Sequence, residues 1–195
     1  FDTEEPDEGD YYISVDLAGF ADIEKATTSK QKKLDTTSIS VVKAGVDGWW
    51  VDNIIYGRWD VKKTADKIFQ AVRDYQPIAV GVEKGALKNA VYPYLTDRMK
   101  QEQFFFRVEE LTHGNKRKTD RIIWALQGRF EHGQITLNEG EWNTEFLDQL
   151  FQFPNHLVHD DLIDSLAYID QLAKISYAYD YEEDEYEFMD AIAGY

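Results

Sequence analysis

Residues 78–83 read Ile-Ala-Val-Gly-Val-Glu, a run of small and apolar residues that ends on an acid. An uninterrupted run of this kind is typical of a strand that is buried on both faces at the centre of a parallel sheet. Such a sheet requires helices on both of its faces. The stretch therefore predicts an α/β domain whose central strand presents Glu83 at its carboxyl end.

The segments on either side of this strand have helical patterns. Apolar residues recur at helical spacing over residues 61–75, and Pro77 lies just beyond the expected end of that helix. Residues 86–100 are also expected to be helical, although Pro93 lies within them. The central strand is thus predicted to have a helix before it and another after it.

Three strands are expected before the first of these helices. Residues 11–15 and 36–42 are rich in β-branched and aromatic residues, and residues 49–56 supply a third strand. Asp47-Gly48, between the second and third, is a signal for a tight hairpin turn. The pattern predicts three antiparallel strands in meander order.

After the central strand we expect a strand over residues 104–108, a helix over residues 119–132 and a last helix over residues 160–176. Three strands in a meander followed by α/β units is the order of the ribonuclease H-like fold, although the order alone suits several other α/β folds. We therefore predict an α/β domain with a ribonuclease H-like mixed sheet, three antiparallel strands and then parallel strands, flanked by helices.

Charge is distributed unevenly along the chain. The formal net charge is −16, but residues 1–10 and 176–195 together hold 13 of the 37 acids and none of the 21 Lys and Arg residues. The net charge of residues 11–175 is therefore only −3, which leaves a nucleic-acid partner possible. We expect an acidic linker over residues 1–10, one domain over residues 11–176 and an acidic, aromatic tail over residues 177–195.

Two absences from the sequence narrow the chemistry. The chain contains no cysteine, which excludes disulfides, zinc–thiolate sites and cysteine nucleophiles. No apolar stretch approaches the roughly 18 residues that a membrane span needs, so no membrane partner is expected. Any metal ion must therefore be held by oxygen or imidazole ligands.

Three acidic features lie where a metal site could form. Asp16 and Glu83 each follow an apolar strand, and ligands of open α/β sheets bind beyond the carboxyl ends of such strands. In His-Asp-Asp-Leu-Ile-Asp-Ser-Leu-Ala, residues 159–167, Asp161 and Asp164 are neighbours on one helix face, where like charges repel unless a cation lies between them. Each feature has a structural alternative, because an Asp can form a turn and acids are favoured at helix N-termini.

A site made only of carboxylates suits the hydrolysis of a phosphodiester. Mg²⁺ prefers oxygen ligands in octahedral geometry and retains bound waters, so three or four carboxylates suffice to hold it. Two such ions, roughly 3.5 to 4 Å apart, can activate a water and stabilise the leaving oxygen. Asp16 is the acid that we expect to bridge both ions.

Four segments together resemble the C-terminal nuclease domain of the large terminase subunit of tailed bacteriophages, the motor that cuts and packages DNA. They are Val-Asp-Leu-Ala at 15–18, Gly-Val-Glu-Lys at 81–84, Lys-Thr-Asp-Arg at 118–121 leading to Gly-Arg-Phe-Glu-His-Gly at 128–133, and the motif at 159–167. The resemblance implies that Asp16, Glu83, Asp161 and Asp164 are catalytic and bind Mg²⁺ or Mn²⁺, as two ions. The pattern of related Holliday-junction resolvases, an Asp three residues before Asp-Ala-Leu-Ala, favours Asp161, and Asp160 remains an alternative ligand.

The resemblance also implies partners. They are double-stranded DNA, an N-terminal packaging ATPase domain of the same protein, the small terminase subunit, and the portal or procapsid. The chain has no Walker-type phosphate-binding loop, so it would be the nuclease half of the large subunit. Such a viral protein is expected in the host cytoplasm and not in the virion.

Two groups of basic residues are candidates for DNA contacts. They are Lys32 and Lys33, with Lys30, after the first strand, and Lys116, Arg117, Lys118 and Arg121 around the start of the helix at 119–132. The second group is the stronger candidate because helix-terminal N–H groups add to its side chains, whereas the first can equally be a solvated loop. Contacts confined to phosphates predict little sequence preference and a steep loss of binding as salt rises.

Two other functions fit parts of the sequence. One is another ribonuclease H-like nuclease, such as a junction resolvase, which would prefer four-way junctions to linear duplexes. The other is a non-catalytic portal-binding module whose working part is the acidic tail. Cleavage that is lost in Asp16→Asn would favour the nuclease over the binding module.

Overall fold

The structure, a computed structural model, describes residues 4–18, 36–112, 117–155 and 157–173. Its elements are β1 (Asp10–Asp16), β2 (Thr37–Gly45), β3 (Gly48–Gly57), α3 (Val61–Tyr75), β4 (Ala79–Glu83), α4 (Ala86–Glu102), β5 (Val108–Leu111), α5 (Lys118–Glu131), β6 (Ile135–Leu137), α6 (Asn143–Gln152) and α7 (Asp161–Ala167). None of the described helices has the length and apolar character of a membrane span.

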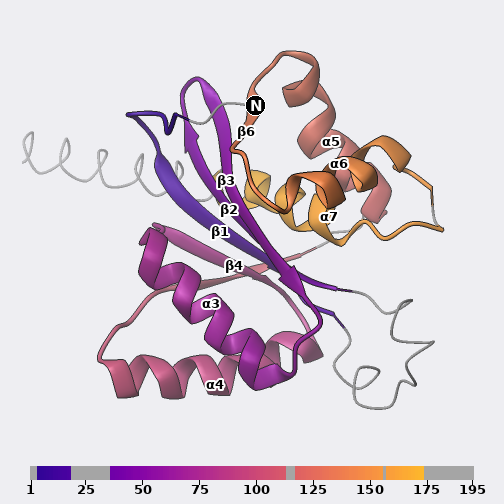
Figure 1. The fold of residues 1–195 in the computed structure, drawn as a ribbon. Coiled ribbons are helices and arrows are strands. Elements are labelled where there is room, and N and C mark those ends of the chain that lie inside the picture. Colours follow the sequence, from indigo (N-terminus) through magenta and orange to yellow (C-terminus); the bar gives the residue numbers. More distant parts are fainter. Residues whose placement is uncertain (1–3, 19–35, 113–116, 156, 174–195) are drawn as a thin grey trace, which may run out of the picture.

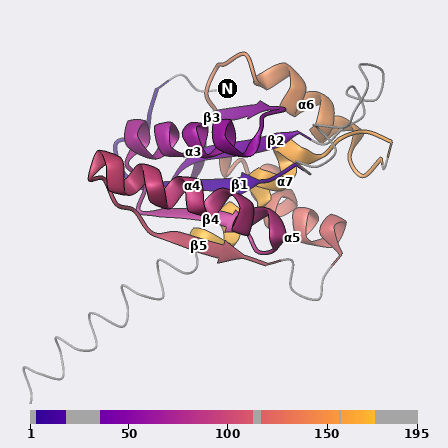
Figure 2. The ribbon, with the colours of Figure 1, turned by 90° about the horizontal axis from the view of Figure 1, so that it is seen from below.

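The strands form one six-stranded sheet in the order β5-β4-β1-β2-β3-β6. The predicted antiparallel meander of β1, β2 and β3 is confirmed, and β4, β5 and β6 add parallel pairings. Figure 2 shows β3, β2, β1, β4 and β5 following one another across the sheet. The carboxyl ends of β1, β3, β4 and β5 therefore meet at one edge, here called the site edge and marked by Asp16, Gly57, Glu83 and Leu111.

Helices cover both faces of the sheet. α3 and α4 lie on one face, and α5, α6 and α7 lie on the other (Figure 1). Alternate residues of β1 serve the two faces, because Ile13 and Val15 pack in the cluster that contains Ile68 of α3, whereas Tyr12 packs in the cluster that contains Leu166 of α7. The amphipathic helix predicted over residues 61–75 has the predicted bounds and is capped by Asp60, whose side chain accepts from the N–H of Lys63 at 2.7 Å.

Serine side chains hold α7 against the sheet. The Ser165 hydroxyl lies 2.8 Å from the hydroxyl of Ser38 and 2.7 Å from that of Ser40, and it also reaches the Leu162 carbonyl at 2.9 Å. The Ser14 hydroxyl donates to the Ser165 carbonyl at 2.6 Å. All four serines are fully buried. Small side chains on the strands let the helix backbone approach closely, and the hydroxyls satisfy one another there.

The strand predicted over residues 104–108 was placed too early, because β5 begins only at Val108. The two preceding aromatic residues serve the helical layer, since the rings of Phe104 and Phe106 lie 5.8 and 6.1 Å from the ring of Phe69 in α3. The apolar run that resembled a strand is thus the edge of the α3 cluster. The backbone enters the sheet after that packing is complete.

Two elements were missing from the predicted order. β6 has only three residues and pairs with β3 in parallel, placing Ile135 opposite Trp49. α6 buries Phe146 and Gln149, and Leu150 packs against the same cluster. The spacing of Phe146 and Leu150, one helical turn apart, was a signal for this helix. The part of the last helix that was predicted beyond residue 173 and the tail at 177–195 lie outside the described residues.

Candidate metal-binding and active site

Asp16 and Glu83 end neighbouring strands at the site edge. β1 and β4 pair in parallel with Val15 opposite Val82, so the two acids follow directly from paired residues. The first turn of α7 reaches the same edge, because the N–H of Thr36, the residue before β2, donates to Oδ2 of Asp161 at 2.8 Å. The predicted acids from the first strand, the central strand and the last helix are therefore brought to one edge of the sheet.

Asp16 lies in an unfavourable environment for a carboxylate. Its exposed fraction is only 8%, and burial raises the pKa of its carboxyl well above the ordinary value of 3.8. The Asp164 carboxylate raises this pKa further, as do Asp161 and Glu83, while the Lys118 ammonium opposes them. A carboxyl group surrounded in this way ionises readily only when more positive charge is supplied.

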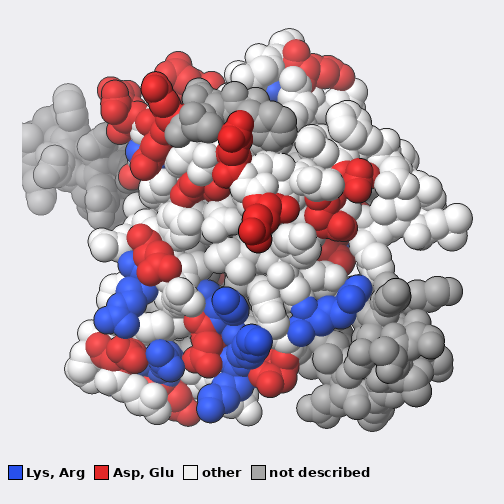
Figure 3. All heavy atoms as spheres, in the orientation of Figure 1, with Lys and Arg blue, Asp and Glu red and all other residues white. Residues whose placement is uncertain are grey.

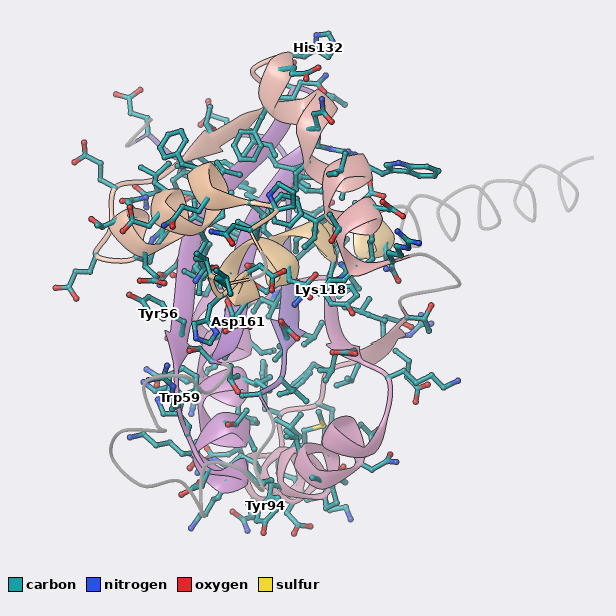
Figure 4. The ribbon with its side chains drawn as sticks, turned by 90° about the vertical axis from the view of Figure 1, so that its right-hand side faces the viewer. Tyr56, Trp59, Tyr94, Lys118, His132 and Asp161 are labelled. Carbon is teal, nitrogen blue, oxygen red and sulfur yellow. The ribbon has the colours of Figure 1, made fainter. Side chains whose placement is uncertain are left out.

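Lys118, the first residue of α5, bridges two of the acids of the last helix motif. Its Nζ lies 2.8 Å from Oδ1 of Asp160 and 3.0 Å from Oδ2 of Asp164. Burial lowers the pKa of Lys118, but the carboxylates of Asp164, Asp16 and Asp160 outweigh burial and raise this pKa above its ordinary value. Figure 4 shows Lys118 and Asp161 beside each other on the face turned to the viewer. Lys118 is thus a resident cation of the site edge.

Arg121, one turn further along α5, is held inside the protein. Its exposed fraction is 7%, its Nη2 pairs with Oδ1 of the buried Asp164, and its guanidinium lies 3.8 Å from the centroid of the Tyr168 ring. Its Nε and Nη1 have no hydrogen-bond partner among the described residues. Arg121 therefore neutralises Asp164 and packs under α7.

Tyr168 completes the buried surroundings of the acids. Burial raises the pKa of its hydroxyl, Arg121 opposes this effect, and Glu83, Asp164 and Asp16 raise the pKa further. Tyr168 was missed by the sequence reasoning, although it lies four residues after Asp164 and so shares its helix face. No comparable signal indicated that Arg121 points inward.

Among the described residues, no group of three or more Asp, Glu or His side chains is arranged to hold one metal ion in this conformation. The chemistry of the donors nevertheless fits a hard divalent cation, because all five acids offer oxygen ligands. When all are ionised, these five carboxylates exceed the two cations by three charges; the residues are Asp16, Glu83, Asp160, Asp161, Asp164, Lys118 and Arg121. The burial and raised pKa of Asp16 are the signs that this excess is not balanced by the chain itself.

The residues predicted to contact DNA have different placements. Arg117 is exposed at the start of α5, in the predicted position for a phosphate contact. Lys118 is engaged by carboxylates, and the burial of Arg121 does not support the predicted phosphate contact. Lys116, like Lys30, Lys32 and Lys33, lies outside the described residues.

The chain is similar in sequence to one protein family. The family profile described as "Terminase RNaseH-like domain" matches residues 19–171, a range that begins just after Asp16. No functionally curated protein matches the sequence.

Solved structures share its fold. The human cytomegalovirus terminase nuclease domain, Mn soaked, superposes with a TM-score of 0.57 at 15% identity, covering 87% of this chain and 86% of that one. The large terminase nuclease from the thermophilic phage G20c with bound zinc gives 0.55 at 16% identity, covering 85% and 82%. The large terminase of another thermophilic bacteriophage gives 0.54 at 10% identity and covers 85% of this chain but only 39% of that one. The predicted ribonuclease H-like mixed sheet is confirmed by these likenesses together with the strand order.

Proposed function

Because the chain belongs to the family of terminase ribonuclease H-like domains, we propose that it is the nuclease domain of a terminase large subunit and cuts double-stranded DNA during viral genome packaging. The observation that carries this proposal is the set of acids at the site edge, above all the buried Asp16 between Glu83 and Asp161. Such a set has no evident structural use, since like charges gathered in a buried place destabilise a fold.

Asp16, Glu83 and Asp161 are the residues that would hold divalent ions. Two ions, Mg²⁺ or Mn²⁺, would activate the attacking water and stabilise the leaving oxygen of the phosphodiester. The manganese-soaked and zinc-bound terminase nucleases support the use of a divalent ion. Asp16 is the best candidate to be shared between two ions, because the other acids surround it.

The remaining residues of the site hold and orient these acids. The Thr36 N–H fixes one oxygen of Asp161 at 2.8 Å. Lys118 and Arg121 engage Asp164, so we assign Asp164 to the positioning of α7 and give it a metal-binding role only if Lys118 moves away. Asp160 is held by the same Lys118 ammonium. This division refines the sequence prediction, which treated Asp161 and Asp164 alike.

The proposed partners follow from the proposed function. The large terminase of which the matched part is only 39% is longer than this chain, which supports a place for this domain beside a packaging ATPase domain in one protein. We propose the portal or procapsid and the small terminase subunit as further partners, and the host cytoplasm as the place of action. The acidic tail at 177–195 is our candidate for the portal contact.

Cleavage of linear duplex DNA in Mn²⁺ tests the proposal. Asp16→Asn should abolish cleavage, whereas Asp47→Asn, in the hairpin turn at the opposite edge of the sheet, should leave it unchanged. Mn²⁺ at about 100 times its dissociation constant should stabilise the wild type by roughly 2.7 kcal/mol and should not stabilise Asp16→Asn. Full cleavage by Asp16→Asn would reject the site, and a preference for four-way junctions would reject the packaging role.

A further inference from the structure

The first half of α3, with the residue that leads into it, presents basic side chains beside the site edge. This α3 basic face consists of Arg58, Lys62, Lys63 and Lys67. Arg58, Lys62 and Lys63 are exposed, and Lys67 is half-buried with its Nζ 6.0 Å from the centroid of the Trp59 ring. Lys62 and Lys63 have no ion-pair partner among the described residues. The sequence patterns had not indicated these residues as a binding surface.

The acids of the same segment are already engaged. The Asp60 side chain caps α3 by accepting from the Lys63 N–H at 2.7 Å. Asp66 pairs with Arg98 of α4 at 3.3 Å. The positive charge of the α3 basic face is therefore not cancelled by its own helix, although the whole chain has a net charge of −16. In Figure 3 most of the Lys and Arg residues lie over α3 and α4, interspersed with acids, whereas the charged residues of the upper half are nearly all acidic.

The sheet register fixes how far this face lies from the candidate site. Gly57 at the end of β3 pairs with Thr37, and the next residue of β2, Ser38, pairs with Asp16. Two strand spacings separate β3 from β1, which is about 10 Å. Figure 4 shows Trp59 and Asp161 on the same side of the molecule. The basic face therefore begins about 10 Å from the acids.

We propose that the α3 basic face binds the phosphate backbone of the DNA duplex that enters the candidate site. This inference rests on the proposed function for the identity of the substrate. One strand presents a phosphate about every 3.4 Å along the duplex axis, so a phosphate held at the acids has neighbours about 10 Å away, at the distance of this face. Lys62 and Lys67 are separated by about 7.5 Å along α3, a length over which one strand presents two phosphates.

The contacts are of the kind that positions a duplex without reading its sequence. Flexible lysines on the outside of a helix bind phosphates and cannot reach base edges from this side of the backbone. The counterions that they displace make the binding depend on salt, with a slope of about 0.9 in log affinity per phosphate contact. The α3 basic face therefore supplies affinity and orientation, and the acids at the site edge supply the chemistry.

The test is binding of a fluorescent linear duplex to the full chain, measured by anisotropy in EDTA over a range of salt. The triple variant Lys62→Ala, Lys63→Ala, Lys67→Ala should bind on the order of tenfold to a hundredfold more weakly, and its salt slope should fall by about 2 to 3. Wild-type affinity and slope in this variant would overturn the proposal. Thermal unfolding of the variant should match the wild type, because the three side chains lie on the outer surface of α3.

A matched control lies at the other edge of the sheet. Arg73 near the end of α3, Lys100 near the end of α4 and Arg107 before β5 carry the same total charge on the same layer. Replacing these three by Ala should change affinity and slope much less. An equal loss in the control would mean that only overall charge matters, and it would overturn the proposal.

Two further arms separate this inference from neighbouring ones. Binding is measured without metal, so a protein that cleaves nothing but still loses binding in the α3 variant would retain the DNA surface and lose the proposed nuclease. A synthetic peptide of residues 177–195 tests whether the face binds an acidic protein segment instead. Tight peptide binding that is lost in the α3 variant, with DNA binding unchanged, would overturn the proposal.

Discussion

Replacing Arg121 by Met should lower the free energy of unfolding by about 3 kcal/mol. Arg121 and Asp164 form a buried ion pair, with exposed side-chain fractions of 8% and 2%. Removing one partner of such a pair typically costs about 3 to 5 kcal/mol, because the other charge stays buried. Lys118, 3.0 Å from Asp164, retains part of the compensation, and Met removes the two guanidinium nitrogens that lack partners. These two effects place the expected value at the lower end of the range.

The assay is urea or thermal unfolding of the full chain in EDTA, followed by circular dichroism. For a domain of this size, about 3 kcal/mol corresponds to a fall in melting temperature of roughly 6 to 12 °C. Arg129→Met is the matched control, since Arg129 is on the same helix, pairs with Asp170 at 3.0 Å and lies 4.3 Å from the Trp49 ring. Its side chain is 30% exposed, so its removal should cost about 1 kcal/mol or less.

A double variant separates the buried charge from the lost packing. Arg121→Met with Asp164→Leu removes both charges, and its stability should lie above that of Arg121→Met alone. If Arg121→Met unfolds within about 0.5 kcal/mol of the wild type, or if the double variant is the sum of the two single losses, Arg121 does not act by neutralising Asp164.

Three further predictions concern single residues. Asp16→Asn should raise the melting temperature in EDTA at neutral pH; because the folded-state pKa of Asp16 is above its ordinary 3.8, the charged form destabilises the fold, so the gain should shrink as pH falls through that raised pKa towards 3.8, and a gain that does not depend on pH would contradict this cause. Ser165→Ala should cost about 1 to 3 kcal/mol in urea unfolding, because buried hydroxyls of β2 lose a partner, and a change under about 0.3 kcal/mol would show that they pair elsewhere. Gly81→Ala should cost about 1 to 3 kcal/mol, because the new Cβ would lie 2.5 Å from the fully buried Leu111 side chain, whereas Gly128→Ala, with open space around it, should stabilise α5 by up to about 1 kcal/mol.

The elements that the sequence predicted best are those whose own residues decide their structure. The run at 78–83 is apolar enough to be central whatever surrounds it, and the helix at 61–75 has its stripe, its cap and Pro77 after it. β6 has three residues, too few for any period to show, and exists because β3 offers it a partner. Its prediction required knowledge of the tertiary neighbour.

The acids of the site were predicted for a similar reason. Asp16 and Glu83 follow strands that are recognisable in the sequence, so their common edge follows from the parallel pairing. The roles of Lys118 and Arg121 did not follow, because bases in the first turn of a helix read equally well as phosphate ligands. Only the packing of α5 against α7 turns Arg121 towards Asp164.

The serines beneath α7 make the spacing of the candidate site adjustable. The acids of α7 belong to a helix whose height above the sheet is set by hydroxyl-sized side chains, while Asp16 belongs to the sheet itself. Ser40→Thr would add one methyl group to that contact and lift the helix by a fraction of an ångström, together with Asp161. A graded series at the strand serines would therefore act as a set of shims, changing the distance between ligands, and hence the preferred size of the metal ion, without altering any ligand.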